Sequence, residues 1–116
     1  DTLTTDPSIV QLPTGGWLMA MSRGQATVLA RSSNGVTFSA GETLTYGGVP
    51  ELALTSDGRV RLYVCARGIE SYVSSDGGGS WRREGTVGPR LTTTGYMMCD
   101  PSLVAGTDVF LYKTAD

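Results

Sequence analysis

The absence of one residue type limits the chemistry that this chain could carry out. Among its 116 residues there is no histidine, the commonest metal ligand and the usual acid–base group near neutral pH. Catalysis would therefore have to rest on carboxylates, arginines and tyrosines. The two cysteines, Cys65 and Cys99, are spaced unlike a zinc site and have no histidine to join them. We expect no structural zinc, no other bound metal and no cofactor.

The elements that must position such side chains are short β-strands. The chain alternates β-patterned runs with glycine and proline, and no apolar stripe at helical spacing is long enough for a helix. We therefore predict an all-β protein. The predicted strands cover residues 8–12, 17–21, 26–31 and about 37–40, then 49–54, 59–64 and 68–73, and finally 100–104 and 109–112.

Composition and charge exclude some classes of partner. A hydrophobic content of 40% and a charged content of 17% suit one small packed domain. The net charge of −2 gives no electrostatic reason to expect nucleic acid or an anionic membrane surface. No apolar run reaches the roughly 18 residues of a membrane helix, and the first residues do not resemble a signal peptide. We expect neither nucleic acid binding nor membrane insertion, and since the chain lacks an initial Met we interpret it as processed, trimmed or excised.

One turn has a specific pattern, Ser-x-Asp-x-Gly-x-x-Trp, which begins at Ser74 and ends at Trp81. The short acceptor side chains of Ser74 and Asp76 can bond the backbone of their own turn. Gly78 allows a positive φ, and Trp81 packs the turn against apolar side chains. The pattern predicts a folded hairpin turn.

Two further patterns show that the chain repeats itself. Residues 32–38 are a shortened version of the same turn, with Asn in place of Asp and Phe in place of Trp. The sequence Asp-Pro-Ser-aliphatic-Val occurs at 6–10 and again at 100–104. The period is roughly 42 to 50 residues, which is the range of one four-stranded propeller blade.

The turn at 74–81 resembles the Asp-box of sialidases and other bacterial neuraminidase repeat proteins. The resemblance implies a partial β-propeller of four-stranded antiparallel blades, related to five- and six-bladed glycoside hydrolases. It implies one blade at about 6–44, a second at about 49–88 and the inner hairpin of a third at about 98–113. Two and a half blades cannot close a ring, so we expect completion by copies of the chain, by a companion chain or by missing residues.

The same resemblance places the candidate site on the face opposite to the Asp-box. The candidate catalytic carboxylates are Asp6, Glu51 and Asp100, and the candidate sugar-binding residues are Arg23, Arg67, Tyr46 and Tyr96. Two carboxylates about 5 Å apart, or about 6.5 to 9.5 Å apart, are the minimum for glycoside hydrolysis. Arginine can bind a sugar carboxylate through two hydrogen bonds, and tyrosine can stack on a sugar ring.

Each group also has a structural interpretation. The two Asp-Pro aspartates recur in register, as residues that cap turns do. The two arginines precede glycines at predicted hairpin ends, and the two tyrosines can pack between blades. No Arg-Ile-Pro segment and no set of three pocket arginines is found, so the sequence departs from the sialidase pattern.

The two cysteines are relevant to where in or outside the cell the protein is located. Cys65 follows a predicted second strand and Cys99 precedes the next first strand, so both should lie on the same face of neighbouring blades. They are either a disulfide or two free thiols. The bridge would fit an extracellular or periplasmic protein, which is the location that we expect.

Three functional hypotheses remain. The first is a carbohydrate-binding or scaffold module that holds a glycan or a partner at the centre of an assembled ring. The second is a glycoside hydrolase, sialidase-like or arabinanase-like, that uses paired carboxylates. The third is a partial or engineered propeller piece without a function of its own.

Overall fold

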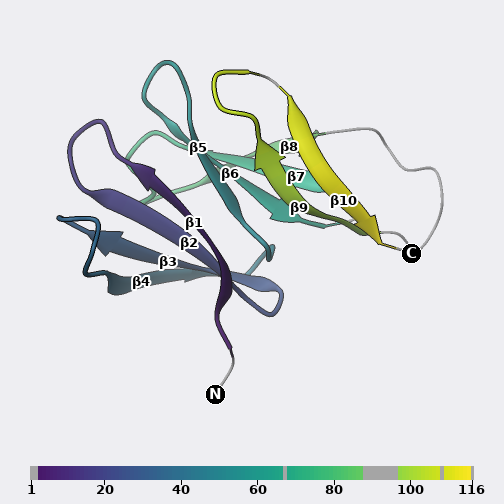
Figure 1. Ribbon diagram of the computed structural model, residues 1–116, viewed down its shortest axis with the longest axis horizontal. Coiled ribbons are helices and arrows are strands. Elements are labelled where there is room, and N and C mark those ends of the chain that lie inside the picture. The colour runs from purple at the N-terminus through teal and green to yellow at the C-terminus, as the bar shows by residue number, and fades with distance from the viewer. Residues whose placement is uncertain (1–2, 67, 88–96, 108, 116) are drawn as a thin grey trace.

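The computed structural model describes residues 3–66, 68–87, 97–107 and 109–115, which form strands joined by turns. Three antiparallel sheets contain ten strands, and the described residues include no helix (Figure 1). The first sheet contains β1 (Thr5–Gln11), β2 (Trp17–Arg23), β3 (Ala26–Ser32) and β4 (Ser39–Leu44). The second contains β5 (Glu51–Leu54), β6 (Val60–Cys65), β7 (Ile69–Ser74) and β8 (Arg82–Val87), and the third contains β9 (Met97–Leu103) and β10 (Phe110–Ala115). The all-β prediction is confirmed.

The alternation of side chains along β2 explains why this segment is a strand. Leu18, Ala20 and Ser22 are buried, whereas Met19 and Met21 on the opposite face are only partly buried. A period of two residues is the spacing at which a strand presents side chains to one face. β2 is paired on both sides, by β1 and by β3, so its backbone hydrogen bonds are satisfied within the sheet.

The strand β4 begins later than the sequence predicts. We expected it at about 37–40, whereas it spans Ser39–Leu44. The preceding turn takes up more of the chain, because Asn34 Oδ1 accepts hydrogen bonds from the amides of Val36 and Thr37, each at 2.9 Å. Those bonds keep both residues in the turn, and β4 pairs with β3 only after them.

The main hydrophobic core lies between the first and second sheets. Its buried residues are Leu18, Ala20 and Leu29 from the first sheet and Leu52, Val60, Leu62 and Val64 from the second. Tyr46 and Tyr72 pack at its edge, where their rings stack with centroids 4.2 Å apart. Each fully buried aliphatic side chain contributes about 1.5 to 3 kcal/mol, so this interface stabilises the described fold substantially.

A smaller cluster lies on the other face of the second sheet, which is turned toward β9. Tyr63 and Ile69 are buried there, with Ala53 and Val87 packed against them. β9 lies beside β5 and β6 (Figure 1). A disulfide between Cys65 and Cys99 joins the end of β6 to β9 across a Cα separation of 4.6 Å. The third sheet is thus held to the second by a covalent bond as well as by packing.

The pairing registers show that the three sheets repeat one another. In each sheet the residue two positions after the proline of the first strand pairs with a residue of the second strand. The opposed pairs are Ile9 and Met19 in the first sheet, Leu52 and Leu62 in the second, and Leu103 and Phe110 in the third. Residues of one sheet can therefore be matched with residues of the next.

The first strands also share a bend before their prolines. Asp6, Val49 and Asp100 each precede a proline and have φ of +52°, +44° and +52°. The register places Val49 at the position of the two aspartates and Glu51 level with Ser8. A left-handed backbone is unfavourable for a β-branched residue, whereas aspartate adopts it more readily.

The turn between β7 and β8 is built by its own side chains. Ser74 Oγ accepts a hydrogen bond from the Gly78 amide at 2.7 Å, and Asp76 Oδ1 accepts from the amides of Gly79 and Ser80 at 3.0 and 2.9 Å. The Ser80 hydroxyl donates to Asp76 Oδ2 at 2.6 Å. The turn between β3 and β4 uses a serine and an asparagine in the same way. Side-chain acceptors that satisfy turn amides explain why both turns need these residue types.

The strained bend at Val49 gives a stability prediction. We expect Val49→Asn to raise the free energy of unfolding by about 1 kcal/mol, because asparagine tolerates the left-handed backbone better than valine. Urea denaturation monitored by circular dichroism measures the change. Val36→Asn is the matched control, since Val36 is exposed and has no positive φ. A Val49→Asn protein no more stable than wild type would contradict the assignment of strain.

The two related turns give a pH prediction. Hydrogen bonds from Ser80 and Ser74 and from turn amides hold the pKa of Asp76 well below its usual value. Because the pKa is lower in the folded state, the stabilisation is complete above the unfolded value of about 4 and is lost as the pH falls below it. We expect Asp76→Asn to reduce the loss of stability in acid and Asn34→Asp to increase it. Urea titrations between neutral pH and about pH 2 measure how steeply the free energy of unfolding falls with pH in each variant. Equal slopes in the two variants would contradict the prediction.

Candidate functional site

One serine joins the inner edges of the first two sheets. Ser8 Oγ on β1 accepts a hydrogen bond from the Leu52 amide on β5 at 2.9 Å, and the same hydroxyl donates to Glu51 Oε2 at 3.0 Å. β5 is the edge strand of its sheet, so its outward amides have no ladder partner within that sheet. Ser8 supplies that partner and at the same time fixes the position of a carboxylate.

Glu51 is the best-positioned carboxylate at this edge. It is partly buried, opens β5 and lies opposite Tyr63 on β6. Within the described chain only its Oε2 takes part in a hydrogen bond. Oε1 is therefore able to accept a hydrogen bond from a ligand hydroxyl or amide. This geometry suits recognition of a polar ligand.

The two repeated aspartates lie in different surroundings. Asp6 is exposed and accepts a hydrogen bond from the Thr5 hydroxyl at 2.7 Å, and Asp100 is exposed in β9. Both occupy the left-handed bend before proline, which accounts for the choice of aspartate without a catalytic role. In the described part of the chain no hydrogen bond or ion pair joins either of them to Glu51.

The other sequence-predicted ligands are not brought together. Arg23 is exposed at the end of β2. Tyr46 lies between the first two sheets, where burial raises its pKa and the neighbouring Tyr72 raises it further. Its ring is engaged in stacking on Tyr72 rather than presented to solvent. Arg67 and Tyr96 lie outside the described residues.

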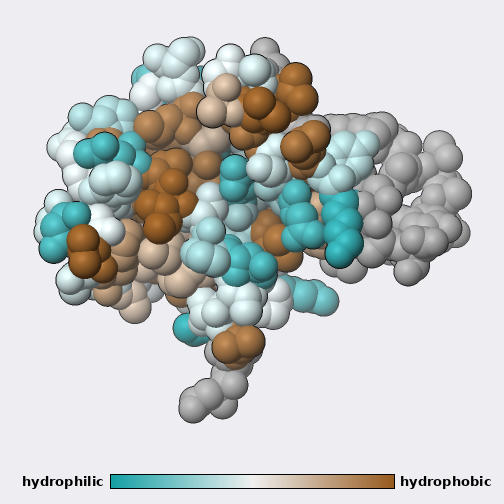
Figure 2. All heavy atoms as spheres, viewed as in Figure 1, coloured by the Kyte–Doolittle hydropathy of each residue, from teal (hydrophilic) through white to brown (hydrophobic). Residues whose placement is uncertain are grey.

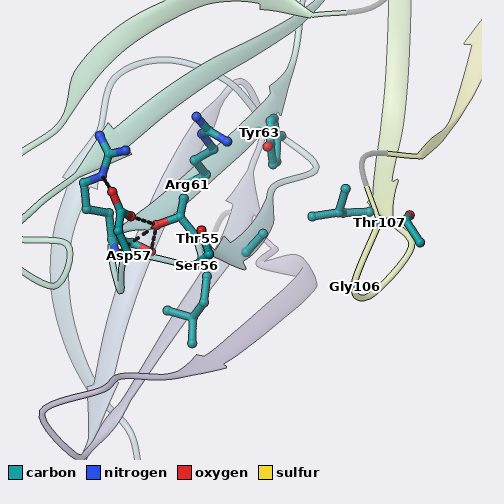
Figure 3. Close-up of a pocket in the computed structure, with 11 residues that line it drawn as sticks. Thr55, Ser56, Asp57, Arg61, Tyr63, Gly106 and Thr107 are labelled. Atoms are coloured by element: carbon teal, nitrogen blue, oxygen red, sulfur yellow. Dashed lines mark hydrogen bonds and ion pairs between the residues drawn. The ribbon is translucent and has the colours of Figure 1, made fainter.

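A polar cleft of about 600 Å³ opens between the β5–β6 turn and the β9–β10 turn (Figure 3). Figure 3 shows the first turn on one side and the second turn on the other, with two side chains of β6 between them. The labelled residues are Thr55, Ser56 and Asp57 from the β5–β6 turn, Arg61 and Tyr63 from β6, and Gly106 and Thr107 from the β9–β10 turn. The sequence did not predict this cleft, because it depends on the distance between two turns far apart in the chain.

The charges around this cleft are already paired. Arg59 Nε lies 2.9 Å from Asp57 Oδ2, and the hydrogen bonds from Arg59 and Thr55 lower the pKa of Asp57 to about 2. Arg61 Nε lies 2.9 Å from Glu84 Oε2, and Arg61 lowers the pKa of Glu84 below its usual value. A charged ligand would compete with these ion pairs, so the cleft is a weaker candidate than the inner edge.

The turn between β7 and β8 belongs to the sheet interface. Arg31 Nη1 on β3 donates a hydrogen bond to the Gly77 carbonyl at 2.8 Å. A Cβ at Gly78 would lie 2.7 Å from Leu18 Cδ2, so only glycine allows the turn to approach the first sheet this closely. Trp81 packs against the main core. The four signature residues Ser74, Asp76, Gly78 and Trp81 thus fold the turn and seat it on the neighbouring sheet.

Sequence reasoning missed Ser8 and Arg31, whose side chains form hydrogen bonds from the first sheet to the second. A signal for Ser8 was present, since Asp-Pro-Ser occurs twice. Ser102 holds the same position in β9, but it is exposed and forms no hydrogen bond with the described residues. The repeated serine therefore marks a shared position, and only the structure shows which copy bridges two sheets.

Comparisons with known proteins provide no further assignment. No family model, no curated protein and no solved structure matches this chain. Among the described residues, no group of three or more His, Cys, Asp or Glu side chains is arranged to hold a metal ion. No helix of the described chain is long and apolar enough to cross a membrane.

The bridging role of Ser8 is open to test. We expect Ser8→Ala to lower the free energy of unfolding by about 1 to 2 kcal/mol, because the Leu52 amide and the Glu51 carboxylate lose their partner. Ser102→Ala is the matched control and should change stability by less than about 0.5 kcal/mol. Chemical denaturation measures both values. Equal effects of the two substitutions would contradict the bridge.

Proposed function

We propose that this chain is a carbohydrate-binding β-propeller module whose ligand is recognised at the inner edges of the first strands. Antiparallel four-stranded sheets with matching registers support the propeller interpretation, as do the related turns after β3 and β7. A propeller stacks such sheets around a centre with their first strands innermost. The β1 and β5 edges would then lie next to the central face.

The observation that carries the proposal is the Ser8–Glu51 pair. A hydroxyl from one sheet holds a carboxylate of the next at 3.0 Å, and the second carboxylate oxygen has no partner in the described chain. A fixed acceptor of this kind suits a sugar hydroxyl, because hydrogen bonds to a charged group contribute about 1.5 to 3 kcal/mol.

Binding is favoured over hydrolysis by the surroundings of the other acids. Hydrolysis of a glycosidic bond requires a second carboxyl group directed at the same bond. The repeated bend accounts for both Asp6 and Asp100, since Val49 occupies the same bend in the second sheet. Glu51 is thus the one of these three carboxylates that the bend before proline does not explain.

The proposal predicts glycan binding that depends on Glu51. Against a panel of neutral and sialylated oligosaccharides, we expect the chain to bind at least one class, and Glu51→Gln to weaken that binding by about tenfold. Isothermal titration calorimetry measures both. Glu42→Gln is the matched control, because Glu42 lies on β4 at the opposite edge of the first sheet.

Two outcomes would overturn this proposal. Absence of binding to every glycan in the panel would reject carbohydrate recognition. Turnover of aryl glycosides that Glu51→Gln abolishes would replace the binding module with a glycoside hydrolase.

A further inference from the structure

The first sheet has one covered face and one open face. Leu18 and Ala20 are fully buried beneath the second sheet. On the opposite face Ile9 is 45% exposed, and Met19 and Met21 are only partly buried. The strands β5 and β6 of the second sheet pack on the covered face through Leu52, Leu62 and Val64. Val28 and Ala30 on β3 lie beside Met21 and Met19 on this face and are buried there. The open face is apolar, and among the described strands none of another sheet lies against it.

The register identifies what kind of surface this open face is. In the second sheet, the residues at the equivalent positions face the first sheet and are buried. The equivalent residues are Ile9 and Leu52, Met19 and Leu62, and Met21 and Val64. Leu52, Leu62 and Val64 are no more than 4% exposed, because the first sheet covers them. The open face thus repeats a surface that another sheet covers elsewhere in the same chain.

The prolines in or just before β1, β5 and β9 show the same difference in exposure. Pro50 and Pro101 are buried, whereas Pro7 at the equivalent position is exposed. Pro7, two residues before Ile9, therefore lacks the cover that its two counterparts have.

The third sheet presents the complementary open face. Val109 is 54% exposed and Leu111 is 62% exposed on β10 and the residue before it. Their counterparts in the first sheet are Leu18 and Ala20, which pack against the second sheet. Figure 2 shows apolar residues at the surface over the β9–β10 sheet as well as over the β1–β2 region. The chain thus carries both halves of a sheet-to-sheet junction that it does not itself form.

We propose that a second copy of this chain covers both open faces, with the β9–β10 sheet of each copy seated on the β1–β4 sheet of the other. Both junctions repeat the packing of the first sheet on the second. The methionines at 19 and 21 suit this role, since their flexible side chains adapt to a partner surface. The result is a closed pair with twofold symmetry, in which each copy contributes one Ser8–Glu51 pair. The inference rests on the propeller arrangement proposed above.

Light scattering on the full chain without glycan tests this association. We expect a mass twice the 12.2 kDa of one chain. Met19→Glu and Leu111→Arg should each weaken association at least about a hundredfold, because each buries an unpaired charge. Mixing the two variants should restore the pair, since one junction is then native and the other joins Glu to Arg. Leu3→Glu, an exposed apolar residue outside both faces, should have no effect.

Other results would overturn the proposal. One is a wild-type protein whose mass is that of a single chain at every concentration. The other is a pair that persists in both the Met19→Glu and the Leu111→Arg variant. If either variant fails to fold, hydrogen exchange on the wild type decides, because protection of β2 and β10 amides should rise with concentration while that of β7 does not. Concentration-independent protection throughout would reject the pair. The mass and exchange measurements involve no sugar, so a failure of glycan binding and a failure of self-association give separate results.

Discussion

The described structure depends on one constraint, which is that an antiparallel sheet with apolar side chains on both faces must be covered on both faces. The first and second sheets meet this requirement for each other through Leu18, Leu29, Leu52 and Leu62. Because each side chain of a strand belongs to one face, covering one face leaves the other to be covered by something else. The remaining features follow from this: the β7–β8 turn seated on the first sheet, the Ser8 bridge and the open faces at either side.

The cross-sheet contacts show how apolar packing and polar contacts cooperate. Packing alone does not fix the position of one sheet along the other, since the hydrophobic effect is non-directional. Ser8 and Arg31 supply direction, because each makes a hydrogen bond to a backbone group of the second sheet at less than 3 Å. The two bonds lie at different parts of the interface, one from β1 to β5 and one from β3 to the β7–β8 turn. Together they define how the sheets are placed relative to each other, and so where Glu51 lies.

Much of the fold was predictable from the sequence, because its signals are local. Glycine and proline mark the strand ends, and the Ser-x-Asp pattern at 74–76 predicts a turn whose amides are bonded by its own side chains. The start of β4 was misplaced because Asn34 holds two more residues in the turn than a count of pattern positions suggests. The bend at Val49 had no signal in the sequence, because a valine stands there in place of the aspartates at 6 and 100. The site was less predictable, because the Ser8–Glu51 contact and the cleft depend on how whole sheets are placed.

The Cys65–Cys99 disulfide changes what a break in the chain means. It closes a covalent ring that contains β7, the turn after it and β8. One peptide bond cut anywhere between these two cysteines opens the ring but leaves both products attached through sulfur. A protease acting in that interval would thus produce a nicked protein of undiminished mass, and only a reductant would release the pieces. Outside a reducing environment, the disulfide therefore keeps the two parts of a cleaved chain together where the backbone no longer does.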